Sequence, residues 1–189
     1  MRGPRGRRGW TNAYPADAGG RHLLPSISHQ MNVIDNSGLL AIATRLQRLA
    51  DQFRKDGVLI YKDQGIDFQP KWFPVIYTLH HKPGISVMEL AAEIGYAHPS
   101  TIILLKELEK EQLIQSKRDR LDERKRLLLL TEKGRQLIGQ MEHVWHAMTA
   151  ATAELTNTHN NLLKAIEEVE AKFRERSFLE RALRTLPGE

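Results

Sequence analysis

The chain has 189 residues, of which 41% are hydrophobic and 27% charged, a balance typical of a soluble globular protein. It contains no cysteine, which excludes thiolate catalysis, cysteine redox sensing and cysteine-ligated zinc. No apolar run approaches the ~20 residues that cross a bilayer. The net charge is +5, but the first thirty residues carry +4 of it, so total charge is only a weak sign of nucleic-acid binding.

Residues 1–30 are rich in Arg, Gly and Pro and have no hydrophobic period, so we predict a disordered basic segment. It could be a basic arm that touches the DNA backbone. It could equally be an extra leader, because Met31 directly precedes the first segment with a regular pattern. No secretory signal is recognisable, and we expect a cytoplasmic protein that does not enter the membrane.

Apolar residues at steps of three and four predict two helices in the first half of the chain. The first is expected at Ser37–Lys55, with Gly57 as its stop signal. Its inward face would be formed by Leu39, Ile42, Leu46, Leu49 and Phe53. The second is expected at Pro70–His81, with one face formed by Phe73, Ile76 and either Leu79 or His80.

Two short helices joined by about four residues follow, which is the helix-turn-helix signature. Ser86 and Glu89 form a capping box at the start of the first helix, and Gly95 ends it. Pro99 opens the second helix, which continues through Lys110. The expected packed residues are Val87, Leu90, Ala91, Ile94, Leu104, Leu105 and Leu108.

The stretch from Gln112 to Gly134 has apolar ends and a charged middle, as expected for a β-hairpin with a solvated tip. Basic residues outnumber acidic ones within it: Lys117, Arg118, Arg120, Arg124, Lys125 and Arg126 against Asp119, Asp122 and Glu123. A basic hairpin directly after a helix-turn-helix is a wing that can hold DNA phosphates and a minor groove. The alternative is an edge hairpin whose charges only prevent aggregation.

Beyond the hairpin, Thr131 is expected to cap a long helix, and residues 153–161 to contain a bend before a last helix. The apolar faces of the flanking helices are larger than a compact winged domain of ~60 residues could cover. They must pack on each other or on a second chain, and two DNA half-sites one turn apart require a two-fold dimer. We therefore expect a homodimer. The alternative is a monomer with a small helical cap.

Three motifs together resemble the MarR (multiple antibiotic resistance regulator) family of bacterial transcription factors. They are the segment Ser86–Ile114, the pair Asp122-x-Arg124, and the run Leu130-Thr131-x-x-Gly134. The resemblance covers about residues 36–186. It implies a mainly α fold with a small β-hairpin wing, in which residues 68–130 form the winged helix-turn-helix. Residues 36–60 and 131–186 would then form the helical dimerisation region.

In this family pattern, the recognition helix enters the major groove, Arg124 borders the minor groove, and Asp122 holds the arginine. The alternative for Asp122 and Arg124 is a local surface ion pair worth under ~1 kcal/mol. The family has polar or basic residues where this chain has Ile102 and Ile103, so one of these could contact a thymine methyl group. Alternatively, Ile103 packs in the core and leaves Ser100 and Lys106 to read DNA. The full set of candidate DNA-binding residues is His98, Ser100, Thr101, Ile102, Ile103, Lys106, Arg118, Arg120, Asp122, Arg124 and Lys125.

The resemblance also implies a small effector, frequently aromatic or anionic, bound between the dimerisation helices and the winged domain. The candidate lining residues are Tyr61, Trp72, Phe73, Tyr77 and His80. The alternative is that these residues are ordinary core. His143 and His146, one helical turn apart beside Glu142, could ligate a metal, but such a pair more often forms a solvated helix face.

No phosphate-binding glycine loop, nucleophile elbow or zinc-protease motif is present, so we expect neither an enzyme nor a cofactor. We expect a sequence-specific, ligand-responsive repressor that binds double-stranded DNA as a homodimer on a pseudo-palindromic operator. The alternative is a winged-helix dimer that acts mainly through protein contacts and binds DNA weakly and without sequence preference.

Overall fold

The computed structural model describes residues 32–118 and 126–186. The predicted basic segment 1–30 lies outside the described residues. The chain divides into two units between Arg45 and Leu46. The described part of the first unit holds α1 (Val33–Asn36), the 3₁₀ helix η1 (Gly38–Ala41) and the start of α2 (Ile42–Asp63). Every other element belongs to the second unit.

Helix α2 does not stop at Gly57, so that prediction was wrong. Gly57 is buried inside the helix, where an added Cβ would lie 3.3 Å from Pro70 Cγ and 3.7 Å from Met148 Cε. The glycine therefore permits close approach of other segments rather than ending the helix. The apolar face predicted for this helix is not covered within the single chain, since Leu46, Leu49 and Phe53 are 41–49% exposed.

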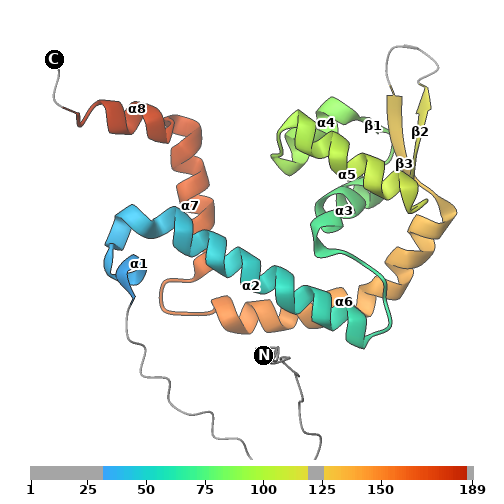
Figure 1. The fold of residues 1–189 in the computed structure, drawn as a ribbon, viewed down its shortest axis with the longest axis horizontal. Coiled ribbons are helices and arrows are strands. Elements are labelled where there is room, and N and C mark those ends of the chain that lie inside the picture. Colours follow the sequence, from blue (N-terminus) through green and yellow to red (C-terminus); the bar gives the residue numbers. More distant parts are fainter. Residues whose placement is uncertain (1–31, 119–125, 187–189) are drawn as a thin grey trace, which may run out of the picture. The chain divides into compact units, whose positions relative to one another are not determined.

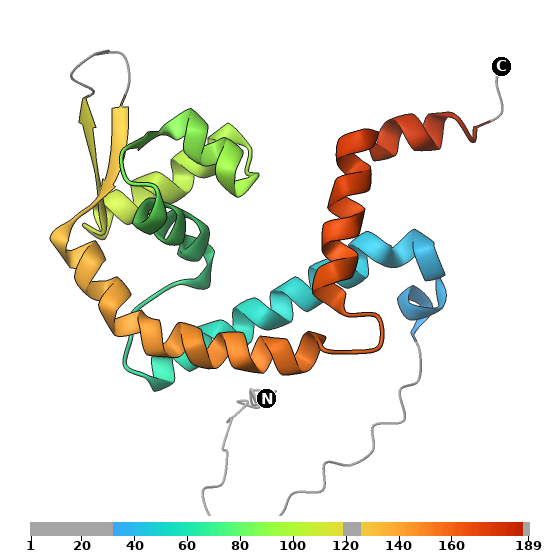
Figure 2. The same cartoon turned by 180° about the vertical axis from the view of Figure 1, so that it is seen from behind.

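The winged-helix region follows the predicted order (Figure 1). It consists of η2 (Pro70–Trp72), α3 (Phe73–His81), β1 (Ile85–Ser86), α4 (Val87–Ile94), α5 (His98–Lys110), β2 (Ile114–Arg118) and β3 (Arg126–Leu130). Figure 2 shows the three helices gathered around the base of the small sheet. The mainly α fold with a small β-hairpin is thereby confirmed.

The sheet has three strands in the order β1-β3-β2, and both pairings are antiparallel. The hairpin register places Ile114 opposite Leu130 and Arg118 opposite Arg126. Strand β1 was not predicted from the sequence, because two residues carry no alternating pattern. It joins the sheet through Ile85, which pairs with Leu128.

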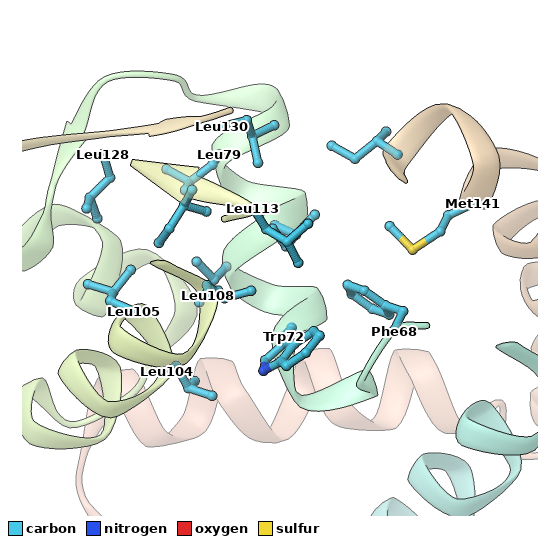
Figure 3. Close-up of a cluster of buried hydrophobic side chains, with 14 of the residues drawn as sticks. Phe68, Trp72, Leu79, Leu104, Leu105, Leu108, Leu113, Leu128, Leu130 and Met141 are labelled. Atoms are coloured by element: carbon cyan, nitrogen blue, oxygen red, sulfur yellow. The ribbon is translucent and has the colours of Figure 1, made fainter. Parts of the chain in front are cut away.

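A single hydrophobic cluster holds the winged-helix region together (Figure 3). Leu108 from α5, Leu79 from α3 and Leu128 from β3 are all at most 1% exposed. Met141 from α6 (Glu132–Thr156) is fully buried in the same cluster. The cluster fixes the angle of α5 against the sheet, and so sets the direction in which the outer face of α5 points.

Local capping signals explain where the helices begin. Ser86 and Glu89 form the predicted capping box, and Gly95 ends α4 in the left-handed conformation at φ 69°. Thr131 caps α6 by accepting a hydrogen bond from the backbone N–H of Gly134. These three predictions are confirmed.

The last predicted helix is in fact two helices, α7 (Leu162–Glu175) and α8 (Phe178–Leu183). The break comes at Arg176 and Ser177, where Ser177 forms a second capping box with Glu180. Neither helix contains a buried residue. None of the described helices is long and apolar enough to cross a bilayer.

Candidate nucleic-acid interface

The N-terminus of α5 is open. Ala97 occupies the cap position in an extended conformation, and no side chain caps the first turn. His98 and Ser100 are exposed there. The free N–H groups of a helix N-terminus form a binding site for an anion such as a phosphate. The first turn of α5 therefore offers both backbone donors and polar side chains to a ligand.

Thr101 is a correction to the predicted set. Its side chain is fully buried, and its hydroxyl donates a hydrogen bond to the carbonyl of Ala97. A threonine of a helix can satisfy its hydroxyl in this way, four residues back along the chain. Thr101 therefore supports the helix from inside and cannot contact DNA through its side chain.

The outer face of α5 carries a row of exposed side chains at steps of three: Ser100, Ile103 and Lys106. Residues three apart lie on one face of a helix. Ile103 is 60% exposed, so the alternative in which it packs in the core was wrong. Ile102 is half-buried beside this row. A large exposed apolar residue between two polar ones is suited to contact a methyl group in a groove.

Glu107 on the inner side of α5 ties the helix to the segment before α3. The indole N–H of Trp72 donates to its carboxylate at 3.0 Å, and Lys71 Nζ lies 2.6 Å from the same oxygen. The hydrogen bonds from Lys71 and Trp72 hold the pKa of Glu107 below its usual value.

Trp72 was predicted to line an effector cavity. This prediction was wrong, because the ring of Trp72 lies in the core and its N–H donates to Glu107.

The base of the wing carries two arginines. Arg118 and Arg126 are exposed and lie opposite each other across the β2–β3 ladder. Like charges directly opposite destabilise a strand pair, and an anion between them would relieve the repulsion. The other predicted wing residues, Arg120, Asp122, Arg124 and Lys125, lie outside the described residues. Their roles stay predictions.

A cavity of about 1110 Å³ lies among α2, α3, α6 and the start of α7. Three of the predicted effector residues line it: Tyr61, Phe73 and Tyr77. His80 does not, because it borders a separate small pocket beside the hairpin, together with Gln115 and Lys117. Helical spacing alone grouped His80 with Phe73 and Tyr77, but its side chain points to another side of α3.

The cavity wall contains a cluster of aromatic side chains, of which the sequence predicted Phe73 and Tyr77 but not Trp145. The rings of Phe73 and Tyr77 stack with centroids 5.0 Å apart, and Trp145 meets both edge-on at 5.7 and 5.6 Å. The indole N–H of Trp145 donates to the hydroxyl of Tyr61 at 2.9 Å. Burial raises the pKa of Tyr61, so this hydroxyl stays neutral at physiological pH. Trp145 was missed because it lies 68 residues or more from Phe73 and Tyr77 in the sequence.

The two neighbouring histidines of α6 point to different surroundings. His143 Nε2 lies 3.3 Å from Gln64 Oε1, whereas His146 lines the cavity. Within residues 32–118 and 126–186, no three His, Asp or Glu side chains are grouped so that they could hold a metal ion.

Comparison with known proteins finds similarity to a family of transcription regulators. Residues 64–125 match the model of the MarR family. This match covers about a third of the chain and lies mostly within its winged-helix region. A curated relative, the HTH-type transcriptional regulator TtmR of Methylorubrum extorquens (strain PA1), is 33% identical over 89 residues. That match covers 47% of this chain and 46% of the relative, so it spans about half the length of each.

Solved structures share the fold over a longer stretch than the MarR model covers. The transcriptional repressor CouR, solved with a 23-mer DNA duplex, is 25% identical, with a TM-score of 0.56. That match covers 70% of this chain and 92% of CouR. PcaV of Streptomyces coelicolor, solved with its natural ligand, is 16% identical, with a TM-score of 0.54, over 71% of this chain and 95% of PcaV. TtmR is described as a transcriptional regulator and CouR as a transcriptional repressor.

Proposed function

We propose that this protein is a transcriptional repressor that binds a pseudo-palindromic operator as a homodimer and responds to a small molecule. The observation that carries the proposal is the exposed row Ser100, Ile103 and Lys106, on a helix whose opposite face is locked in the core. A helix held in this way can keep its polar and apolar groups in register with base edges.

The proposed contacts divide into two kinds. His98, Ser100, Lys106 and Arg118, together with the free N–H groups of α5, would bind phosphates and fix the position of the protein. Ile103, with Ile102 beside it, would contact thymine methyl groups in the major groove. Following the family pattern, Arg120, Arg124 and Lys125 would reach the minor groove, with Asp122 holding Arg124. CouR, which has a similar fold, was solved bound to a DNA duplex, and this supports DNA binding by the winged-helix region here.

The homodimer is proposed from the apolar faces that the single chain leaves open. Ile166, Val169 and Phe173 of α7 are 39–57% exposed, and Phe178, Leu179 and Leu183 of α8 are 58–70% exposed. Exposed apolar surface of this extent marks an interaction site. Residues 36–60 and 131–186 would form the dimer interface, and residues 68–130 would bind DNA. A repressor of bacterial genes would act in the cytoplasm.

Binding to a defined site tests the proposal. Fluorescence anisotropy would compare duplexes from the promoter upstream of the protein's own gene with shuffled duplexes of equal length, across a range of salt concentrations. We expect the promoter site to bind about 10³-fold or more tightly than the shuffled duplex. Equal binding at physiological salt would contradict the operator and favour the alternative, a protein-interaction module with weak DNA affinity.

The role of Ile103 can be isolated with DNA that lacks the thymine methyl group. Deoxyuridine would replace thymidine at one position of the half-site at a time. One such replacement should weaken binding of the wild-type protein and leave Ile103→Ala unaffected, because the variant has already lost the contact. Lys62→Ala, at the exposed end of α2, is the control. If every replacement acts equally on Ile103→Ala and wild type, the thymine contact is wrong.

A further inference from the structure

The charged side chains that line the large cavity differ in whether they form an ion pair. The charged residues are Arg54, Glu142 and Glu154, and the other titratable groups of the lining are His146, Tyr61 and Tyr77. Arg54 is already engaged, since its guanidinium contacts the carboxylate of Asp51. The hydrogen bonds that Arg54 and Gln47 donate to Asp51 lower the pKa of that carboxyl. The arginine of the wall is therefore neutralised by a carboxylate outside it.

The two glutamates have no such partner. Among the residues that the structure describes, neither Glu142 nor Glu154 forms an ion pair. Both lie on α6, on the side that faces the cavity, and none of the described lysines lines the wall. A carboxylate ligand placed here would meet two like charges and no unpaired arginine or lysine of the described chain. A cation would meet two uncompensated opposite charges.

The aromatic group of the wall favours the same sign of charge. Phe73 and Tyr77 are 38% and 42% exposed, so part of each ring is accessible. Trp145 borders the same cavity and is held in place by its hydrogen bond to Tyr61. The face of an aromatic ring carries a negative quadrupole and attracts cations within about 6 Å of the ring centroid. The aromatic rings and the carboxylates of this cavity therefore both favour a positively charged ligand.

We propose that this cavity binds a bulky organic cation, with apolar or aromatic groups around its positive charge, and discriminates against aromatic carboxylates. Its volume of about 1110 Å³ gives room for such a molecule. Pockets for drug-sized ligands measure about 300–1,000 Å³. Binding of the cation does not depend on the proposed function. The inference rests on that function only for the step in which the bound cation would regulate DNA binding. It departs from the anionic effectors that the family resemblance led us to expect.

Two ions of nearly equal shape and opposite charge test the proposal. Isothermal titration calorimetry in a sodium buffer would measure binding of tetraphenylphosphonium and of tetraphenylborate to the full chain. The cation should bind at least about tenfold more tightly, since carboxylates and ring faces both favour it. Equal affinities, tighter binding of the borate, or no binding of the phosphonium would each overturn the proposal.

Charge-neutral variants locate the effect. The double variant Glu142→Gln, Glu154→Gln should lose most of the preference for the phosphonium. It should keep its fold, because both side chains are exposed. Glu109→Gln removes a charge from an exposed position of α5 outside the cavity and should leave the preference unchanged. If the double variant keeps the full preference, the glutamates do not select the ligand and the proposal fails.

Operator binding measured beside these titrations separates the two proposals. A protein that binds its promoter site but not tetraphenylphosphonium contradicts the cation site alone. A protein that prefers the phosphonium but binds all DNA equally contradicts the proposed function alone.

Discussion

The winged-helix region and the C-terminal helices α7 and α8 have similar apolar patterns and opposite environments. In the first, Leu79, Leu108 and Leu128 are at most 1% exposed. In the second, Leu179 and Leu183 are 65% and 58% exposed, and no residue is buried. A repeat of apolar residues therefore identifies the face of a helix that packs against another surface. It does not say whether that surface belongs to the same chain or to a second one.

The same contrast extends to local signals. Both regions contain a complete capping box, Ser86 with Glu89 and Ser177 with Glu180. Helix α4 goes on to bury Leu90 and Ala91, whereas the six-residue α8 buries nothing within the chain. Local capping starts a helix, but most of its stability comes from packing of an apolar face.

The largest expected effect comes from truncating matched leucines in the two regions. Leu108→Ala removes a fully buried side chain and should lower the free energy of unfolding by about 2–5 kcal/mol. Leu179→Ala removes an exposed one and should act only on the concentration at which the proposed homodimer dissociates. Urea unfolding at two protein concentrations, with sedimentation equilibrium, measures both.

This contrast would break if Leu179→Ala lowered stability as much as Leu108→Ala at every protein concentration. Such a result would mean that α8 is covered by its own chain.

A smaller effect is expected from two glycines of α6, the helix that leads from one region to the other. A Cβ on Gly134 would lie 2.2 Å from the carbonyl oxygen of Leu113, whereas a Cβ on Gly139 would meet nothing within 4 Å. Gly134→Ala should therefore destabilise the protein by about 1–3 kcal/mol or more, through overpacking against backbone.

Gly139→Ala is the matched control and should stabilise by about 0.5–1 kcal/mol, because alanine loses less conformational entropy in a helix. Thermal unfolding followed by circular dichroism measures both variants. Expectations of opposite sign make the pair decisive: two destabilised variants would show that α6 tolerates no Cβ on either side.

The smallest effect is expected from removing one hydroxyl of each capping box. Ser86→Ala should cost about 0.5–2 kcal/mol of global stability, since α4 is part of the core. Ser177→Ala should leave the global unfolding transition unchanged and increase hydrogen exchange in α8 alone. A global loss from Ser177→Ala would place α8 in the cooperative core.

Most of the winged-helix fold could be predicted because each element carries its own signal. Ser86, Gly95, Pro99 and Thr131 mark helix ends through local hydrogen bonding or backbone preference, and the structure has all four in these roles. Gly57 misled for a physical reason. A glycine that ends a helix and one that lets another segment approach look alike in sequence, and only the distance to Pro70 separates them.

The candidate site was less predictable because it depends on contacts between distant residues. The exposure of Ile103 and the burial of Thr101 are decided by the rotation of α5 against the sheet. Trp72 was misplaced because its partner Glu107 lies 35 residues away. Trp145 completes the aromatic wall from α6, far along the chain from α3.

The junction between α5 and α6 has a mechanical consequence. The hydroxyl of Thr131 donates to the carbonyl of Gln112, Lys133 Nζ donates to the carbonyl of Glu111, and Gly134 packs on the carbonyl of Leu113. These contacts fasten the beginning of α6 to the three residues that follow α5. A rotation of α6 cannot leave the end of α5 in place without breaking them. A rotation of α6, which lines the cavity, would therefore be transmitted to α5, the helix that carries Ile103.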